Sequence, residues 1–519
     1  MEQQNLQPLA IQERIGTIDI IRGFALFGIL TINFTVDAGQ TEPWAGFPGI
    51  VDQIVYWPVA FFMNDKFAPI YCFLFGLGFS IQMLRAKERN SPFVFVYMRR
   101  LFVLYLIGAV HQILTRHDIL HNYAMAGVLL LILHKLPRKI LPILAVLCFI
   151  VPWTKQLING LKRESEKETL INYKSITVDT TIIDRYVGVY QISPQLNQIF
   201  IRKGNDLIGE GPERQYNLVP LSDSEFYRTD VNVKITFLQD STGNVNIYNA
   251  VDGNGVKITR QKIKVDLQEA LTKQLQQRTS GNRLKEPESY RKFIEGNAKA
   301  FWNELKNWSW KNYFWGSSIS GILPLFLMGL YFGKRKVFYD ISSSRAFLKN
   351  VLKWGLLIGL TSSVIALGFD AWNYFNDIND ESYSFLTRHI IYACWYFIGV
   401  MGMALGYVAG MALLLENIDW KKRLSFLAPI GRMGLTNYLL QAIIISIIID
   451  PYGFGLNGKA GPALRLLMAL VTFAFITFIS RWWFKRFRIG PAEWLWRMLT
   501  YLKIQPMKLK PINKKEEEL

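Results

Sequence analysis

The chain has 519 residues, of which 50% are hydrophobic and 14% aromatic, and it carries a formal net charge of +19. A soluble domain rarely contains so many aromatic residues, whereas membrane proteins concentrate Trp and Tyr at the bilayer interfaces. The charge does not indicate a nucleic-acid-binding protein, because many basic residues cluster beside apolar segments instead of forming a groove-binding patch. The composition therefore predicts a multi-pass membrane protein.

The first apolar segment is interrupted by polar side chains. Asp19, Arg22 and Asn33 lie on one face of the expected helix, because the eleven residues from Arg22 to Asn33 make almost three turns and about 16 Å of rise. An ionisable residue at membrane depth must face protein or a water-filled cavity, which makes these residues candidates for a functional site. The alternative is an Asp19–Arg22 pair that only fixes helix packing. The segment also lacks a small-residue cleavage site, so we expect a first span and no cleavable signal.

About ten apolar segments are expected to cross the membrane, although some are short for the roughly 20 residues that a bilayer requires. They cover residues 15–36, 67–84, 94–114, 120–134, 139–157, 315–333, 348–369, 388–414, 430–449 and 463–484. With the N-terminus inside, the basic clusters fall on the cytoplasmic side and the acidic loops 37–65 and 370–381 fall outside. Both termini are then cytoplasmic. The short segment 51–63, which contains Pro58, is expected to lie in the interface or to re-enter.

The stretch between the fifth and sixth spans has a different character. Alternating residues in 186–190, 198–201, 231–237 and 245–248 are separated by Gly/Asn/Asp turn signals. This pattern predicts a small antiparallel barrel or sandwich, which span counting puts outside the membrane. Residues 266–310 are expected to be amphipathic helix. The motifs Tyr-Val-Gly-Val-Tyr at 186–190, Leu-Val-Pro-Leu at 218–221 and Ile-Thr-Phe at 235–237 resemble the small β-domain appended to some serine-β-lactamase-like hydrolases. That resemblance implies a fold only.

The predicted organisation has four parts. Residues 1–157 form a membrane half of about five helices, and 158–312 form an extracytoplasmic insert whose β-core covers about 178–268. Residues 313–500 form a second membrane half of about five helices. Residues 501–519 are a charged cytoplasmic tail.

A second polar cluster lies where the third span ends and the fourth begins. If the helix continued, His111 and Asp118 would be two turns apart on one face, although the chain is expected to turn near Arg116. A carboxylate that orients an imidazole is the arrangement that a general base needs. The alternative is a hydrogen-bonded core histidine. His117 and His121 have helical i, i+4 spacing, but no His-Glu-x-x-His motif or third ligand accompanies them, so no metal is predicted.

A third group of polar residues enters the ninth span. Arg432, Thr436 and Asn437 enter from the cytoplasmic side, with Gln441 one turn deeper, and Arg432 could bind a phosphate or a carboxylate as a planar bidentate donor. The alternative for Arg432 is a side chain that snorkels to the interface. Residues 490–497 are expected to form an amphipathic interfacial helix.

Several motifs, in order along the chain, resemble the YeiB-like bacterial membrane proteins, a family of unassigned function. They are Asp-Ile-Ile-Arg-Gly-Phe-Ala-Leu-Phe-Gly-Ile-Leu-Thr-Ile-Asn at 19–33, Phe-Leu-Phe-Gly-Leu-Gly-Phe at 73–79, Gly-Ala-Val-His at 108–111, Asp-Ile-Leu at 118–120 with Tyr123, Gly-Arg-Met-Gly-Leu-Thr-Asn-Tyr at 431–438 and Gly-Pro-Ala-Glu-Trp at 490–494. The resemblance implies residence in the bacterial cytoplasmic (inner) membrane.

The Arg-Gly…Asn opening is also similar to heparan-α-glucosaminide N-acetyltransferase, which moves acetyl from cytosolic acetyl-CoA to an amino sugar across the bilayer. That family uses an Asn that matches Asn33 and a His in the following outer loop. This sequence has no His between Asn33 and His111. If the chemistry is kept, His111 or His117 must have the role of that outer-loop His. A broader likeness is to the acyltransferase-3 membrane proteins, in which an Arg and a His share the eleven-residue offset of Arg22 and Asn33.

The resemblance implies an all-α polytopic membrane acyltransferase bundle with an inserted β-domain. Its donor would be acetyl-CoA or another acyl-CoA, and its acceptor an envelope glycan or other small molecule. Asn33, His111 and Asp118 would be catalytic. Substrate-binding residues would be Asp19, Arg22, His117, His121, Arg432 and Asn437. Two alternatives remain: a transporter or flippase of a small anionic metabolite or lipid head group, and an envelope-binding sensor without catalysis. The expected partners are the lipid bilayer and the acceptor, with no nucleic acid.

Overall fold

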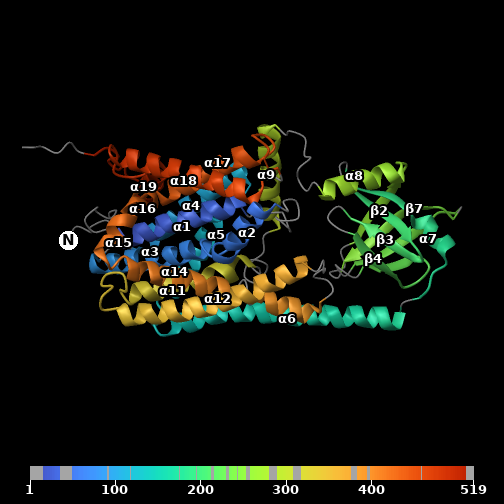
Figure 1. The fold of residues 1–519 in the computed structure, drawn as a ribbon, viewed down its shortest axis with the longest axis horizontal. Helices are drawn as coiled ribbons and strands as arrows, with labels where there is room; N and C mark the ends of the chain where they lie inside the picture. Colours follow the sequence, from blue (N-terminus) through green and yellow to red (C-terminus); the bar gives the residue numbers. More distant parts are fainter. Residues whose placement is uncertain are drawn as a thin grey trace, which may run out of the picture. The chain divides into compact units, whose positions relative to one another are not determined.

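The computed structural model describes residues 16–35, 49–90, 93–116, 118–174, 176–193, 196–211, 215–228, 233–241, 243–252, 257–279, 289–307, 317–375, 383–393, 398–456 and 459–509. The chain forms two compact units (Figure 1). The first contains residues 1–154, 286–376 and 390–519, and the second contains residues 155–285 and 377–389.

The first unit is a bundle of helices. Its elements in chain order are α1 (Gly16–Thr35), α2 (Ile50–Phe62), α3 (Ala68–Glu88), α4 (Phe93–Thr115), α5 (Leu120–Leu133), the first part of α6 (Ile140–Lys174), α9 (Tyr290–Lys306), α11 (Ser317–Lys334), α12 (Arg345–Phe375), the end of α13 (Phe385–Ala393), α14 (Val400–Leu414), α15 (Ile418–Arg423), η5 (Leu424–Phe426), α16 (Leu427–Arg432), α17 (Gly434–Ile449), α18 (Pro462–Phe484) and α19 (Pro491–Tyr501).

Each of the ten expected segments contains helix, but ten membrane spans are not confirmed. Among the described residues, six helices are long and apolar enough to cross a membrane: α1, α3, α4, the first part of α6, α12 and α18. A seventh span is possible if α14 and the helical segment 418–432, which meet at 108°, count as one broken span. Residues 50–62, 120–133, 321–334 and 434–449 form shorter apolar helices. The expected helix over 388–414 contains the end of α13 (to Ala393) and α14 (from Val400), and residues 394–397 at its centre lie outside the described residues.

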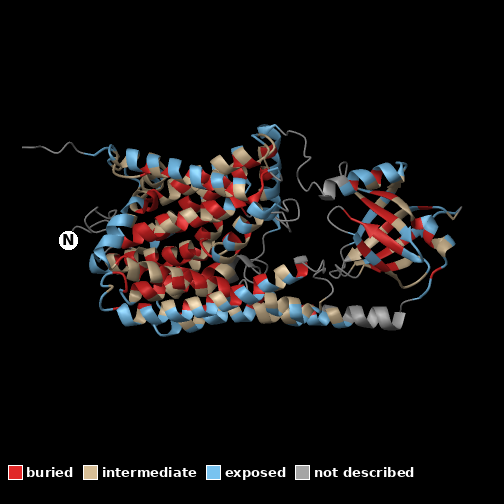
Figure 2. Ribbon diagram, viewed as in Figure 1, coloured by how far each residue is buried: buried red, intermediate tan, exposed pale blue. Residues whose placement is uncertain are grey.

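Glycines let the helices of the bundle approach closely. A Cβ on Gly431 of α16 would lie 1.9 Å from the Asp19 carbonyl oxygen, and a Cβ on Gly23 of α1 would lie 2.2 Å from that of Leu427. Gly76 of α3 and Gly329 of α11 make the same kind of contact with each other's helix. Small residues at such crossings are typical of helix packing in membranes. Figure 2 shows the buried residues gathered inside the bundle, and α1 contacts α2, α3, α14, α16, α17 and α18.

The helix directions follow from paired contacts. Gly28 of α1 packs against Phe67, just before α3, whereas Arg22 lies near Gly78, farther along α3. These two helices are therefore antiparallel. A short connection then reverses the chain into α4, so that Phe79 in the second half of α3 packs on Phe93 and Tyr97 near the start of α4. Helices α1 and α4 consequently run in the same direction.

The second unit is built around a closed antiparallel barrel. Its strands are β1 (Gly188–Ser193), β2 (Leu196–Lys203), β3 (Asp206–Glu210), β4 (Gln215–Pro220), β5 (Glu225–Arg228), β6 (Val233–Gln239), β7 (Val245–Asp252) and β8 (Lys257–Ile263), paired in sequence order and closed between β1 and β8. The predicted inserted β-domain is thus confirmed as a barrel. Tyr186 was expected to begin a strand, but it ends α7 (Thr180–Tyr186).

Aromatic side chains fill the barrel. Its buried core includes Tyr186, Tyr190, Phe200, Phe226, Phe237 and Tyr248. The Tyr186 and Phe237 rings stack with centroids 4.3 Å apart. Helix α8 (Leu267–Thr279) covers β1 and β2. The described core is therefore packed by its own side chains, as in other small barrels.

Candidate functional site

A buried carboxylate joins two histidines in the turn between α4 and α5. His111 Nδ1 donates to Asp118 Oδ1 at 2.9 Å, and His121 Nδ1 donates to Asp118 Oδ2 at 3.1 Å. The backbone N–H of His121 also donates to Oδ2, at 3.0 Å. The side chains of Asp118, His111 and His121 are 0%, 4% and 7% exposed. The expected His111–Asp118 pair forms, although the chain does turn between the two residues.

Local backbone features create this arrangement. Helix α4 ends at Thr115, and Arg116 adopts a left-handed φ of 70°, which reverses the chain so that Asp118 points back to His111. Gly108 permits the close approach: a Cβ there would lie 2.6 Å from both Asp118 Oδ2 and His121 N. His117 lies outside the described residues.

The hydrogen bonds keep Asp118 ionised. Burial by itself opposes the charge, but the bonds from His111 and His121 outweigh it and lower the pKa of Asp118 below its ordinary value. An ionised carboxylate only accepts hydrogen bonds, so both Nδ1 atoms must carry protons. The remaining basic atom of each neutral imidazole is therefore Nε2.

The two Nε2 atoms have different surroundings. His111 Nε2 lies 3.4 Å from Thr115 Oγ1, a hydroxyl that also donates to the His111 carbonyl at 2.9 Å. His121 Nε2 is buried and has no hydrogen-bond partner among the described residues. A buried polar atom without a partner requires an explanation, and a substrate or water is one.

Other helices enclose the pair. The Tyr438 ring of α17 lies 5.3 Å from the His111 ring, and its hydroxyl accepts from Ile119 N at 3.4 Å. Asn297 of α9 donates to the Ile113 carbonyl at 3.0 Å. Helix α9 thus covers the end of α4 beside the histidines.

Arg22 lies in a separate polar group. Its Nη1 donates to Asp19 Oδ1 at 3.2 Å; the Asp19 side chain is 9% exposed and that of Arg22 is 34% exposed. Tyr71 of α3 donates to the Arg22 carbonyl at 3.4 Å. Arg100 of α4 is close enough to Arg22 to interact with it electrostatically, and its guanidinium lies 3.8 Å from the Trp496 ring centre. The predicted Asp19–Arg22 pair therefore forms, with part of Arg22 still accessible.

The described contacts do not bring all the predicted catalytic residues into one cavity. Asn33 is exposed near the end of α1, and no described contact joins it or Arg22 to His111. The helix directions explain why. Asn33 lies eleven residues beyond Arg22 on α1, and His111 lies eleven residues beyond Arg100 on α4. Because α1 and α4 are parallel, the two offsets point in the same direction. Each offset corresponds to about 16 Å. The two arginines and the pair Asn33/His111 thus occupy two different levels of the bundle.

Arg432 and Asn437 make contacts within the protein. The Asn437 amide donates to the Ile430 carbonyl at 3.0 Å and to Ser480 Oγ at 2.9 Å, and the residue is 1% exposed. Both amide hydrogens are therefore used where α16 breaks into α17. The Arg432 guanidinium lies 4.0 Å from the centre of the Phe484 ring. The substrate contacts expected of Arg432 and Asn437 stay a prediction.

The sequence patterns gave no role to three further residues: Tyr438, Arg100 and Lys66. Tyr438 lies within the motif at 431–438, and Arg100 lies beside Arg99 at the start of the third expected span. Lys66, in the α2–α3 loop, is fully buried and donates to the Ala60 and Asn64 carbonyls at 3.3 and 3.2 Å. Burial lowers the pKa of Lys66 to about 8. Its position between an acidic loop and an apolar helix was the available signal.

Two family models match parts of this chain. The family described as "Heparan-alpha-glucosaminide N-acetyltransferase, catalytic" matches residues 14–192, and "Protein of unknown function (DUF418)" matches residues 332–503. The uncharacterized protein YxaH of Bacillus subtilis is 25% identical over 97% of this chain and 98% of its own length.

Two further relatives match shorter regions. The uncharacterized 39.9 kDa protein in the amylase 3' region of Bacillus acidopullulyticus is 33% identical over 26% of this chain and 38% of its own. The uncharacterized protein YeiB of Escherichia coli is 36% identical over 19% of this chain and 25% of its own. No solved structure matches. Together with the motifs and the helical bundle, these matches support the resemblance to the YeiB-like family and its relation to the heparan-α-glucosaminide N-acetyltransferases.

Proposed function

We propose that the protein is a membrane acyltransferase that moves an acyl group from a cytosolic donor, such as acetyl-CoA, to an extracytoplasmic acceptor, such as an envelope glycan. The observation that carries the proposal is the bond from His111 Nδ1 to Asp118, because it leaves Nε2 as the basic nitrogen of an oriented imidazole. The pair lies inside the region that is similar to the acetyltransferase catalytic family.

The proposed reaction is a direct acyl transfer. The acceptor hydroxyl or amine gives its proton to His111 Nε2 while its oxygen or nitrogen bonds to the acyl carbonyl carbon. The carbon–sulfur bond of the thioester then breaks, and the leaving thiolate takes up a proton. Asp118 stabilises the imidazolium that forms. Asn33 would donate its amide to the developing oxyanion, as the family resemblance implies.

The two levels of the bundle suit a long donor. Arg22 and Arg100 would bind its phosphates at one level, and the thioester would react at the level of His111. A flexible arm separates the phosphates from the thioester in an acyl-CoA. Such a ligand can bridge a separation of about 16 Å. His121, whose Nε2 has no partner among the described residues, would bind the acceptor.

The test is acetyl transfer from labelled acetyl-CoA by the full-length protein in sealed vesicles that contain envelope extract. We expect His111→Ala to lower transfer at least about 100-fold, the usual size of a general-base contribution. His389→Ala is the matched control, since His389 lies in the second unit and should leave transfer unchanged. If the wild type transfers no acyl group but accumulates an anionic solute or moves lipid, the transporter alternative is correct. Binding of envelope material without either activity would support the sensor alternative.

A further inference from the structure

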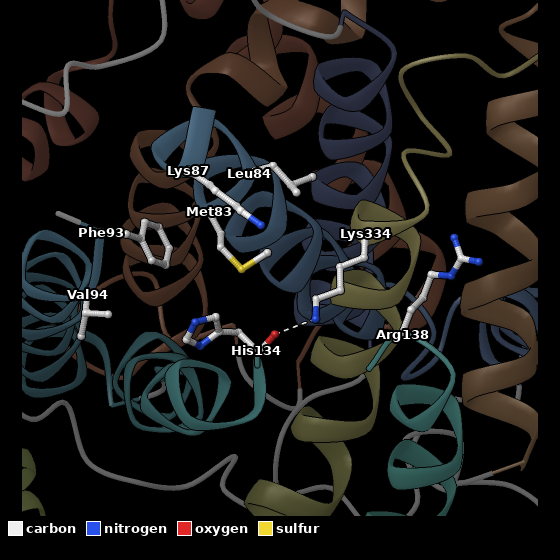
Figure 3. Close-up of a pocket in the computed structure, with 8 residues that line it drawn as sticks. All are labelled: Met83, Leu84, Lys87, Phe93, Val94, His134, Arg138 and Lys334. Carbon is white, nitrogen blue, oxygen red and sulfur yellow. Dashed lines mark hydrogen bonds between the residues drawn. The ribbon is translucent and has the colours of Figure 1, made fainter. Parts of the chain in front are cut away.

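A basic cavity of about 650 Å³ lies away from both polar groups, among the ends of α3, α4, α5 and α11. Lys87, Arg138, Lys334 and His134 line it together with Met83, Leu84, Phe93 and Val94. None of these eight residues is acidic. Figure 3 shows Lys87 and Lys334 extending toward the same space, with Phe93 and Val94 on the side away from Arg138.

The positive charge of the cavity is not neutralised by the protein. Lys334 donates to the His134 and Leu136 carbonyls at 2.6 and 2.8 Å, so its ammonium is held in place by neutral acceptors. Lys87 and Arg138 are exposed and make no ion pair among the described residues. Three cationic side chains without a carboxylate favour an anionic ligand, and phosphate is the group that Lys and Arg commonly bind together.

The apolar side of the cavity continues onto the outside of the bundle. Val94 begins a stripe of exposed side chains that runs along α4 at four-residue intervals, consisting of Val94, Met98, Phe102, Leu106 and Val110. Their exposed fractions lie between 41% and 62%. Residues four apart are neighbours on the surface of a helix, and each step of four advances by about 40°, so this apolar stripe winds gradually around α4 from the cavity. A soluble phosphate compound would not contact this apolar stripe, whereas the acyl chains of a lipid would cover it.

We propose that this cavity binds the head group of an anionic phospholipid, whose acyl chains lie along the exposed stripe of α4. Lys87, Arg138 and Lys334 bind the phosphate, and Phe93 and Val94 contact the first carbons of the chains. Basic pockets between membrane helices are known to bind such head groups. The proposal does not depend on acyl transfer, because it concerns a different cavity and a binding equilibrium.

The experiment measures lipid binding to the purified full-length protein by native mass spectrometry. Phosphatidylglycerol and phosphatidylcholine with identical acyl chains are titrated separately, and inorganic phosphate and coenzyme A are added as soluble competitors. We expect phosphatidylglycerol to bind more tightly than phosphatidylcholine, and neither competitor to displace it. In the double variant Lys87→Gln/Arg138→Gln, the affinity for phosphatidylglycerol should fall about 25-fold, from roughly a factor of five per cation.

The matched control is Lys421→Gln/Lys422→Gln, which removes two exposed cations from α15 and should keep wild-type affinity. Equal affinity for the two lipids in the wild type would overturn the proposal, and so would an equal loss in both double variants. Displacement of the lipid by coenzyme A or phosphate would show that the cavity takes a soluble ligand instead. Thermal unfolding of each variant verifies that the exposed substitutions leave the fold intact.

Discussion

Asp118 determines the chemistry of both neighbouring histidines. Its two oxygens accept from two imidazoles and one backbone N–H, and all three bonds require an ionised carboxylate. The consequence is that His111 and His121 share one tautomer, with the proton on Nδ1 and the basic atom at Nε2. A single buried charge thus prepares two proton acceptors in the same turn.

Asp118→Asn should disrupt this arrangement while nearly preserving the volume of the side chain. An amide offers one oxygen, so its NH₂ group would face an Nδ1–H, and one histidine would have to change tautomer or rotate away. We expect at least about a 100-fold loss of acyl transfer. Transfer at the wild-type rate by a correctly folded Asp118→Asn protein would show that the carboxylate is only structural.

Acid should destabilise the α4–α5 turn through the same residue. The folded-state pKa of Asp118 is lowered, so its contribution to stability is complete above the ordinary Asp value of about 3.9 and is lost as the pH falls through the lowered value. Thermal unfolding in detergent should therefore show a steeper decline below about pH 4 for the wild type than for Asp118→Asn. Parallel declines for the two proteins would contradict the expectation.

At the scale of elements, the site depends on how closely α4 and α5 approach. Gly108→Ala puts a methyl group 2.6 Å from Asp118 Oδ2 and His121 N, so α5 must move away and lengthen the bonds to both histidines. We expect acyl transfer to fall at least about tenfold, because the histidines are then held in the wrong position. Gly321→Ala in α11 is the control, because its Cβ meets nothing within 4 Å and alanine favours a helix by about 1 kcal/mol. Equal activity of the two variants would mean that the helix spacing is not critical.

The elements themselves were more predictable than their junctions. Apolar length located α1, α3 and α4 to within a few residues, because burial in a bilayer dominates every local preference. The turn that joins His111 to Asp118 was foreseen only roughly. It uses a left-handed Arg116, whereas the residue types that usually mark such a conformation are Gly and Asn. Likewise, no local signal predicted that the Asn437 amide would donate to the Ile430 carbonyl and to Ser480, since those contacts depend on how the helices pack.

At the scale of the molecule, the barrel has what it needs to fold by itself. Its eight strands close without an open edge, its interior is packed with aromatic rings, and α8 covers β1 and β2. Gln274 of α8 donates to the Glu210 carbonyl at 2.6 Å. We expect a fragment of residues 178–279 to be soluble and to unfold cooperatively, as measured by circular dichroism. A fragment that ends at residue 266 should be less stable, because it lacks the α8 contacts with Val189 and Ile199. A disordered spectrum for the longer fragment would refute independent folding.

The orientation of the chain in the membrane decides which face of the bilayer each polar group serves. Because α1 and α4 are parallel, one measurement fixes both: if the N-terminus is cytoplasmic, Arg22 and Arg100 lie toward the cytoplasm and His111 lies toward the outside. The basic clusters at 85–100 and 334–336 flank the barrel in sequence and predict that it is extracytoplasmic.

Alkaline phosphatase inserted in the β6–β7 turn, between Asp240 and Val245, should therefore be active, and a fluorescent protein fused after residue 509 should fluoresce in the cytoplasm. The same pair of reporters exchanged between the two positions is the control and should be silent. Phosphatase activity at the C-terminus together with fluorescence at the barrel would show that the chain has the opposite orientation in the membrane. The histidine pair would then face the cytosol, and an acyl-CoA could not donate from the level of Arg22.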